Sequence, residues 1–110
     1  MKPYIPRKGD FITVTFDPQS GHEQRGRRPA LVVSNTVFNR HTGLAIVCPL
    51  TTTDRRFPFH VPVNNPAVTG FIMVEQVKSI DFRARKAKCI GAASTDLLDE
   101  VLSILDACLY

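Results

Sequence analysis

The stretch "GHEQRGRRPALVVSN" (residues 21–35) joins a polar loop to an apolar strand. An Asp-Pro pair, a Ser-Gly pair and a second glycine punctuate residues 17–27, a composition typical of a long loop. Residues 29–35 then predict a strand, and a proline is tolerated at its first position because no ladder hydrogen bond is lost there. The residue before a proline is held in extended geometry. Arg28 is therefore expected to be fixed at the entrance of this strand.

Further segments have the alternation or the continuous apolar character of short β-strands. They are residues 10–16, 44–51 and 58–63, a segment within 70–80, and a last strand that follows a basic bend within 81–91. The two prolines of the third of these predict an edge strand. Residues 36–43 predict a turn or a single helical turn closed by Gly43.

The stretch "STDLLDEVLSILDACLY" (94–110) predicts the one clear helix, with Ser94 or Thr95 as its cap. Two adjacent apolar stripes follow the helical period. They are Leu97, Val101, Ile104 and Cys108, and Leu98, Leu102, Leu105 and Leu109. Most of this wide face is expected to pack on the sheet and the excess to form a dimer contact. Short strands with one terminal helix predict a mainly β, strongly curved antiparallel sheet or small barrel, in a single domain over 1–110.

The net charge of +4 hides an asymmetry along the 110 residues. Residues 1–93 hold all 14 lysines and arginines and six acids, which gives +8, and the remaining four acids give residues 94–110 a charge of −4. A basic body favours a polyanion or an acidic peptide as partner, with a merely solubilising surface as the alternative. Apolar runs are too short for a membrane span, and the start has no signal-peptide h-region, so we expect a cytoplasmic protein.

The three cysteines are odd in number and widely spaced, and no Cys-x-x-Cys pair occurs. Reduced thiols are therefore expected, with no metal and no other cofactor. Cys48 and Cys108 lie among apolar residues, where a free cysteine acts as a small hydrophobe.

Two polar side chains are expected to meet at one rim of the sheet. If strands 29–35 and 44–51 pair through residues 36–43, the start of the first lies beside the end of the second. Arg28 and Thr51 then face each other, and a guanidinium held on a strand end suits bidentate contact with phosphate. The plain alternatives are a salt bridge from Arg28 to an acid such as Asp17 and an ordinary strand-end hydroxyl at Thr51.

The motifs "GHEQRGRRP", "PLTT" and "EQVKSIDFRAR", in this order, resemble the MazF/PemK family of bacterial toxins, from Gly9 to about Arg85. The resemblance implies a PemK/CcdB-type, SH3-like small β-barrel with a C-terminal α-helix, and a homodimer. It implies a metal-independent, sequence-specific endoribonuclease that cleaves single-stranded RNA, the mRNA interferase of a toxin–antitoxin pair. It also implies a cognate MazE-like antitoxin whose acidic C-terminal tail lies in the RNA groove.

The family's catalytic arginine and threonine fall on Arg28 of the "RP" motif and Thr51 of the "TT" motif. Glu23 of the "EQ" motif is a candidate general base, although it equally suits reading a nucleobase or pairing with an arginine. Candidate RNA-binding residues are His22, Gln24, Arg25, Arg27, Thr52, Arg55, Arg56, Gln76, Lys78, Ser79, Arg83 and Arg85. The Arg25–Gly26–Arg27 stretch is more basic than the family pattern requires.

Two other classes of function compete with the ribonuclease. A CcdB-type topoisomerase poison shares the general fold, but such toxins resemble one another in a Trp-Gly-Ile end, whereas this chain ends "ACLY" and has no tryptophan. A non-catalytic RNA-binding barrel needs aromatic side chains exposed for stacking. Most of the nine aromatic residues fall at positions that predict core.

Overall fold

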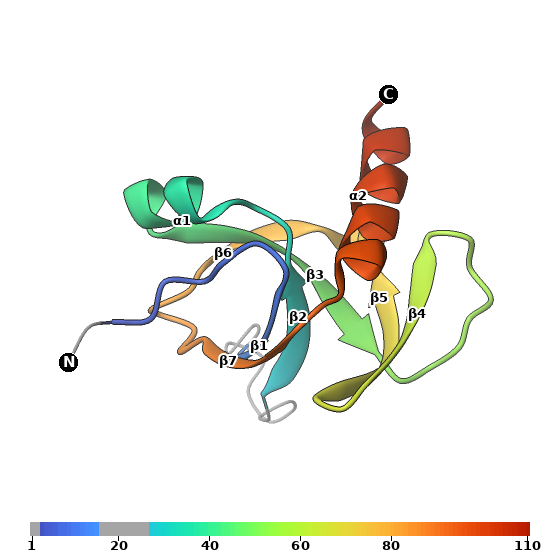
Figure 1. Cartoon of the computed structure of the whole chain (residues 1–110), viewed down its shortest axis with the longest axis horizontal. Coiled ribbons are helices and arrows are strands. Elements are labelled where there is room, and N and C mark those ends of the chain that lie inside the picture. Colours follow the sequence, from blue (N-terminus) through green and yellow to red (C-terminus); the bar gives the residue numbers. More distant parts are fainter. Residues whose placement is uncertain (1–2, 16–26) are drawn as a thin grey trace, which may run out of the picture.

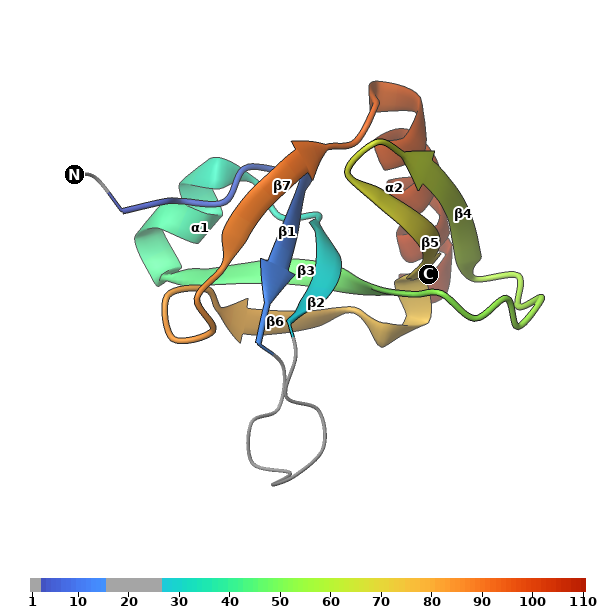
Figure 2. The ribbon, with the colours of Figure 1, turned by 90° about the horizontal axis from the view of Figure 1, so that it is seen from below.

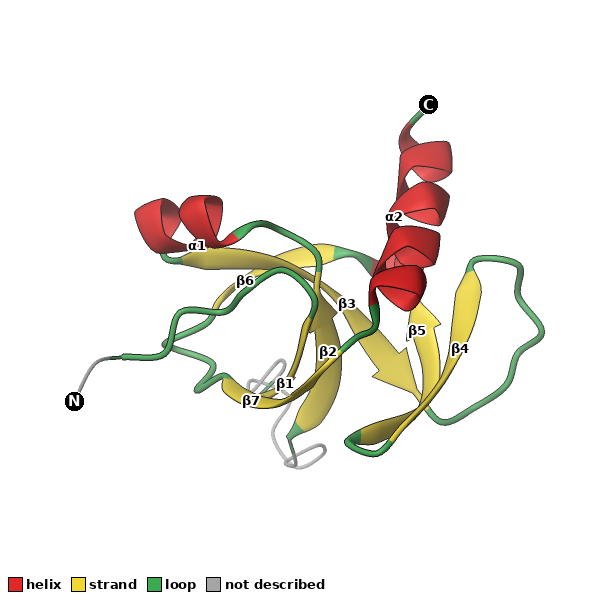
Figure 3. Ribbon diagram, viewed as in Figure 1, coloured by secondary structure: helices red, strands yellow, loops and turns green. Residues whose placement is uncertain are grey.

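The computed structural model describes residues 3–15 and 27–110. Seven strands and two α-helices account for most of these residues (Figures 1 and 3). The elements are β1 (Asp10–Val14), β2 (Arg28–Val32), α1 (Thr36–Thr42), β3 (Leu44–Thr51), β4 (His60–Asn65), β5 (Val68–Met73), the 3-10 turn η2 (Val74–Gln76), β6 (Lys78–Asp81), β7 (Lys88–Ala92) and α2 (Thr95–Leu109). The mainly β prediction with a C-terminal helix is confirmed.

The strands form one antiparallel sheet in the order β4-β5-β3-β2-β1-β7, with β6 paired to β3. Figure 2 shows β3 as the long central strand, with β1, β2, β6 and β7 toward one end of the molecule and the β4–β5 hairpin toward the other. β3 pairs with β6 over its first half and with β5 at its last two residues. The sheet therefore curls strongly into a half-barrel, in agreement with the predicted SH3-like fold. β4 is an edge strand, as the prolines of residues 58–63 predict.

Helix α2 covers one face of this sheet. Val101 is fully buried against a cluster that includes Phe11, Leu31, Leu50 and Ile72. Ser94 caps the helix by accepting a 3.1 Å hydrogen bond from the Leu97 backbone N–H, which satisfies one of the free donors of its first turn. The C-terminal end leaves the sheet, so Leu109 is 69% exposed. The predicted amphipathic helix is confirmed, with its excess apolar surface at this end.

The opposite face of the sheet holds a second cluster inside the curl. Its members come from β1, β2, β3, β6 and the turn that follows β6, and the N-terminal Tyr4 and Ile5 pack against them. The buried residues are Ile12, Val14, Ala30, Val32, Ala45, Val47, Ile80 and Phe82. Residues next to one another on a strand point to opposite faces, so β2 and β3 each serve both clusters.

Local departures from the sequence predictions lie where strands change partners. The apolar segment 70–80 is divided among β5, η2 and β6, because β3 changes from β6 to β5 along its length. Residues 36–42 form a helix of two turns rather than one, closed by the left-handed Gly43. Cys48 is buried, and burial raises the pKa of its thiol to about 12. Cys108, the other cysteine expected to act as a small hydrophobe, is exposed, because α2 projects past the sheet there.

Candidate functional site

Strands β2 and β3 pair antiparallel, as the sequence predicted, through Ala30↔Pro49, Leu31↔Cys48 and Val32↔Val47. Residues directly opposite one another project from the same face of a sheet. Ala30 and Val32 belong to the cluster inside the curl, whereas Leu31 and Cys48 belong to the cluster under α2. The period of two then assigns Arg28 and Thr51 to the face inside the curl, away from α2.

A row of side chains crosses the sheet at the end of β3, where Thr51 lies. Continuing the β2–β3 register by two residues brings Arg28 opposite Thr51. On the far side of β3, Thr51 pairs with Phe71 of β5, and Phe71 pairs with Pro62 of β4. The row Arg28–Thr51–Phe71–Pro62 therefore lies on one face of four adjacent strands, and all four side chains are at least partly exposed.

Thr51 is held by two local contacts. Its Oγ1 accepts a 3.2 Å hydrogen bond from the Thr53 backbone N–H, and the hydroxyl proton is still available to a phosphate oxygen. Its backbone lies against Gly70 of β5, where a Cβ would come within 2.6 Å of the Thr51 carbonyl oxygen. Gly70 has φ +154°, a conformation that favours glycine. The missing side chain at residue 70 therefore permits the close approach of the two strands.

Arg28 is exposed at the start of β2, where Pro29 follows it. Its position opposite Val14 of β1 places it at the rim of the apolar cluster rather than within it. Within residues 3–15 and 27–110, no side chain forms an ion pair with its guanidinium. The alternative partner Asp17 lies outside the described residues.

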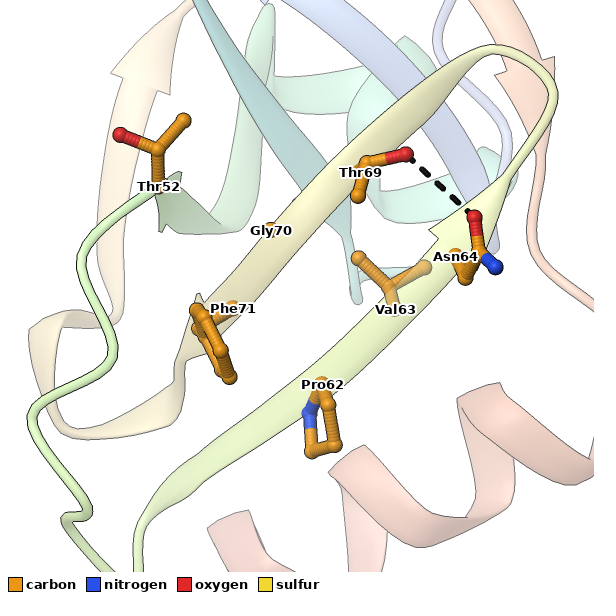
Figure 4. Close-up of a pocket in the computed structure, with 7 residues that line it drawn as sticks. All are labelled: Thr52, Pro62, Val63, Asn64, Thr69, Gly70 and Phe71. Atoms are coloured by element: carbon orange, nitrogen blue, oxygen red, sulfur yellow. Dashed lines mark hydrogen bonds between the residues drawn. The ribbon is translucent and has the colours of Figure 1, made fainter.

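Two neighbouring hollows lie on the outer face of the β4–β5 hairpin, which is the face that carries Phe71 and Pro62 and is turned away from α2. The first, of about 480 Å³, is lined by Thr52, Pro62, Val63, Asn64, Thr69, Gly70 and Phe71 (Figure 4). The second, of about 370 Å³, is lined by Arg55, Phe57, His60, Met73, Glu75 and Gln76. They are neighbours because the pair His60↔Met73 follows the pair Pro62↔Phe71 along the same two strands. We call these two neighbouring hollows together the groove, and their lining includes the predicted residues Thr52, Arg55 and Gln76.

The second hollow contains a pair of residues that the sequence analysis missed. His60 Nε2 lies 3.0 Å from Glu75 Oε2, and Phe57 packs edge-on against the imidazole at 5.2 Å between ring centroids. The His60 side chain is only 4% exposed, whereas that of Glu75 is 27% exposed. Glu75 directly precedes the predicted Gln76, but its pairing with a residue 15 positions away leaves no signal in the sequence.

Two of the predicted RNA-binding arginines are engaged by the protein's own backbone. The Arg27 guanidinium donates to the carbonyl oxygens of Thr13, at 2.6 Å, and of Lys86. Arg85 Nη1 donates to the Thr15 carbonyl oxygen at 3.2 Å. These bonds fasten the ends of β1 and β2 to the turn between β6 and β7.

The remaining candidates are spread around the molecule. Lys78 pairs with Val47 and so shares the face of Thr51, whereas Ser79 pairs with Ile46 and lies on the other face. Arg83 lines a separate hollow with Arg40, at the end of α1. Arg56 is exposed in the turn before β4. The predicted residues His22, Glu23, Gln24 and Arg25 lie outside the described residues.

Comparison with known proteins identifies the relatives of this fold and site. Residues 7–109 match the family model described as PemK-like, MazF-like toxin of type II toxin–antitoxin system. The chain belongs to the PemK/MazF toxin family. This confirms the resemblance carried by the "RP", "TT" and "EQ" motifs.

Relatives of known activity are endoribonucleases. The endoribonuclease toxin MazF of Escherichia coli K12 is 41% identical over 95 residues, which are 86% of each chain. The endoribonuclease toxin ChpB of the same strain is 42% identical over 106 residues, which cover 91% of this chain and 90% of ChpB. The expectation of an endoribonuclease toxin is therefore confirmed at the level of the family, and the topoisomerase-poison alternative is not favoured.

Solved structures agree with this assignment. A MazE–MazF structure from Deinococcus radiodurans superposes with a TM-score of 0.90 at 39% identity and covers 97% of each chain. A MazF structure from the same organism superposes with a TM-score of 0.86 at 39% identity, covering 97% of this chain and 98% of that one. Among the residues that the structure describes, no helix is long and apolar enough to cross a membrane.

Proposed function

We propose that this chain is a metal-independent, sequence-specific endoribonuclease that cleaves single-stranded RNA at the groove beginning at Arg28 and Thr51. The observation that carries the proposal is the β2–β3 register: continued two residues past the pair Ala30↔Pro49, it brings Arg28 level with Thr51, which itself pairs with Phe71 of the β4–β5 hairpin. The 41–42% identity to MazF and ChpB supports the same reaction. The net charge of +8 over residues 1–93 suits a polyanionic substrate.

The reaction uses the RNA's own 2′-OH as nucleophile. The 2′ oxygen attacks the adjacent phosphorus, its proton passes to a base, and the bond from phosphorus to the 5′ oxygen breaks as that oxygen takes up a proton. The products are a 2′,3′-cyclic phosphate and a 5′-OH end. Arg28 stabilises the charge of the phosphorane and suits proton donation better than proton removal, because a guanidinium stays protonated. The Thr51 hydroxyl orients a phosphate oxygen.

Two carboxylates are candidates for the base. Glu23 is a candidate because it belongs to the family's "EQ" motif. Glu75 is a candidate because it lines the groove, where its carboxylate is partly exposed and held by His60. Hydrogen bonding to a nearly buried imidazole orients Glu75 toward the hollow that Arg55 and Gln76 also line. Glu23→Gln and Glu75→Gln variants distinguish the two, because loss of the base removes about 10²–10⁴ in rate, whereas loss of a base-reading contact changes which sequence is cut.

The family and the basic charge of residues 1–93 both indicate the protein partners of this chain. We expect a homodimer and a MazE-like antitoxin whose acidic tail competes with RNA for the groove. The MazE–MazF structures of D. radiodurans support the antitoxin as a partner. The exposed apolar end of α2, with Leu109 and Tyr110, provides surface for a contact between copies. We assign the protein to the cytoplasm, where its RNA substrate is found.

The direct test is cleavage of a long single-stranded RNA in EDTA, with the fragment ends mapped. Cuts at one short sequence that leave 5′-OH ends are expected, and DNA of the same sequence should bind without being cut because it lacks the 2′-OH. Absence of cleavage by the folded protein with and without added Mg²⁺ would overturn the proposed function. Cleavage only with the metal would overturn its metal independence.

Salt dependence tests the groove separately from the chemistry. RNA affinity is expected to fall with ionic strength, with a log–log slope of about −0.7 for each phosphate contacted. Fluorescence anisotropy with a labelled oligonucleotide, 2′-deoxy at the cut position, measures binding without cleavage. Affinity that does not change with salt would contradict a basic phosphate-binding groove.

A further inference from the structure

The outer face of the β4–β5 hairpin exposes an aromatic ring beside Thr51. Buried and exposed residues alternate along both strands, with Val61, Val63 and Ile72 in the core and Pro62 on the outer face. Phe71 is on the outer face too and is only partly buried. Figure 4 shows the rings of Phe71 and Pro62 side by side on neighbouring strands, at the hollow of about 480 Å³.

This hollow combines flat apolar walls with polar groups farther along the hairpin. The rings of Phe71 and Pro62 form the apolar part, and Thr69 Oγ1 hydrogen-bonds Asn64 Oδ1 at 3.5 Å on the same outer face. A planar ligand with apolar faces and hydrogen-bonding edges matches this composition. Nucleobases have this character, and every base has a π face that stacks on an aromatic side chain.

The position of Phe71 next to Thr51 indicates which part of the RNA its ring would contact. Thr51 and Phe71 are direct cross-strand neighbours, and such pairs have Cβ atoms roughly 4.5–5.5 Å apart. A phosphate held by Thr51 and Arg28 thus brings an adjoining base of the same strand next to the Phe71 ring. We propose that Phe71 is the stacking platform for a nucleobase that flanks the cleaved phosphate, with Asn64 and Thr69 at its edge. This inference rests on the proposed ribonuclease function and adds a specificity-determining residue to it.

Binding of oligonucleotides with single missing bases tests the platform. The wild-type cut site is mapped first, and affinities are then measured for RNA that is 2′-deoxy at the cut position and abasic at each flanking position in turn. Phe71→Ala is expected to weaken binding of the complete RNA about 5- to 150-fold. For wild type, removal of the one base that stacks on Phe71 should weaken binding by a similar factor. For Phe71→Ala, the same abasic RNA should bind as tightly as the complete RNA.

Two variants separate stacking from structure. Phe71→Tyr keeps an aromatic face and should retain most of the affinity, whereas Phe71→Leu keeps apolar bulk without the π face and should lose most of it. Phe38→Ala removes an exposed phenylalanine from α1, at the other end of the molecule (Figure 1), and should leave binding unchanged. Thermal unfolding of each variant establishes that the fold persists.

The outcomes distinguish this inference from the proposed function. Cleavage by wild type together with equal abasic penalties in wild type and Phe71→Ala would overturn the platform alone. Unchanged RNA binding by Phe71→Ala, with weaker binding of an antitoxin peptide, would instead make the hollow a protein-docking site and also overturn it. A wild-type protein that cuts no RNA overturns the proposed function, and this inference fails with it.

Discussion

Arg28→Ala is expected to lower the rate of RNA cleavage by about 10²–10³-fold, the loss typical of removing one pre-organised donor from a site of developing charge. Arg28 is the guanidinium that the β2–β3 register brings opposite Thr51, and its side chain is exposed at the strand entrance. Single-turnover cleavage of a mapped RNA at saturating protein measures the chemical step separately from binding.

The fold of this variant should persist, because Arg28 contributes no side chain to either apolar cluster. Arg40→Ala is the matched control, since it removes one exposed positive charge from α1 and should leave the cleavage rate within about twofold. Arg28→Lys should restore only part of the rate, because an ammonium lacks the bidentate geometry of a guanidinium. Cleavage by Arg28→Ala within a few-fold of wild type would remove Arg28 from the mechanism.

The sequence allowed the β2–β3 register, and with it the common level of Arg28 and Thr51, to be predicted because one short connection joins the two strands. With residues 36–43 between β2 and β3, antiparallel pairing brings the start of one strand to the end of the next. Pro29 and the period-two pattern then place Arg28 at the rim. Local chemistry was sufficient for this part of the site, as it was for the Ser94 cap of α2.

The rest of the groove depends on pairings that composition does not encode. Nothing in the sequence states that Phe71 lies opposite Thr51, because that register follows from β3 exchanging β6 for β5. The contact between His60 and Glu75 likewise depends on how β4 pairs with β5. The sequence pattern did not place Phe71 on an exposed face, because hydrophobicity alone cannot separate the two faces of a hairpin whose partner layer is unknown.

The sequence likewise does not show which partners the arginine side chains bind. A cluster of basic residues predicts phosphate contact, yet the guanidinium of Arg27 donates to the carbonyl oxygens of Thr13 and Lys86. A guanidinium satisfies backbone carbonyls as well as phosphates, because it has five N–H donors. Which partner it finds is decided by where the chain ends of β1 and β2 meet the β6–β7 turn.

Gly70→Ala is expected to impair both folding and cleavage, because residue 70 determines how closely β5 approaches Thr51. A Cβ there would lie 2.6 Å from the Thr51 carbonyl oxygen, and φ of +154° strains any residue with a side chain. Strain of this kind costs on the order of 1–3 kcal/mol of the free energy of unfolding. A displacement of Thr51 by about 1 Å lowers the cleavage rate about 10²-fold, since catalysis depends on near-attack geometry.

Gly43→Ala separates strain from displacement. Gly43 also has a positive φ, +73°, but a Cβ there would meet no residue beyond its own chain neighbours within 4 Å, and it closes α1 far from Thr51 in the fold. This control should lose about 1–2 kcal/mol of stability and keep its cleavage rate. Urea unfolding gives the stabilities, and single-turnover cleavage below the unfolding transition gives the rates. Equal rates for Gly70→Ala and wild type would show that Thr51 tolerates displacement, and would weaken its assignment as the group that orients the phosphate.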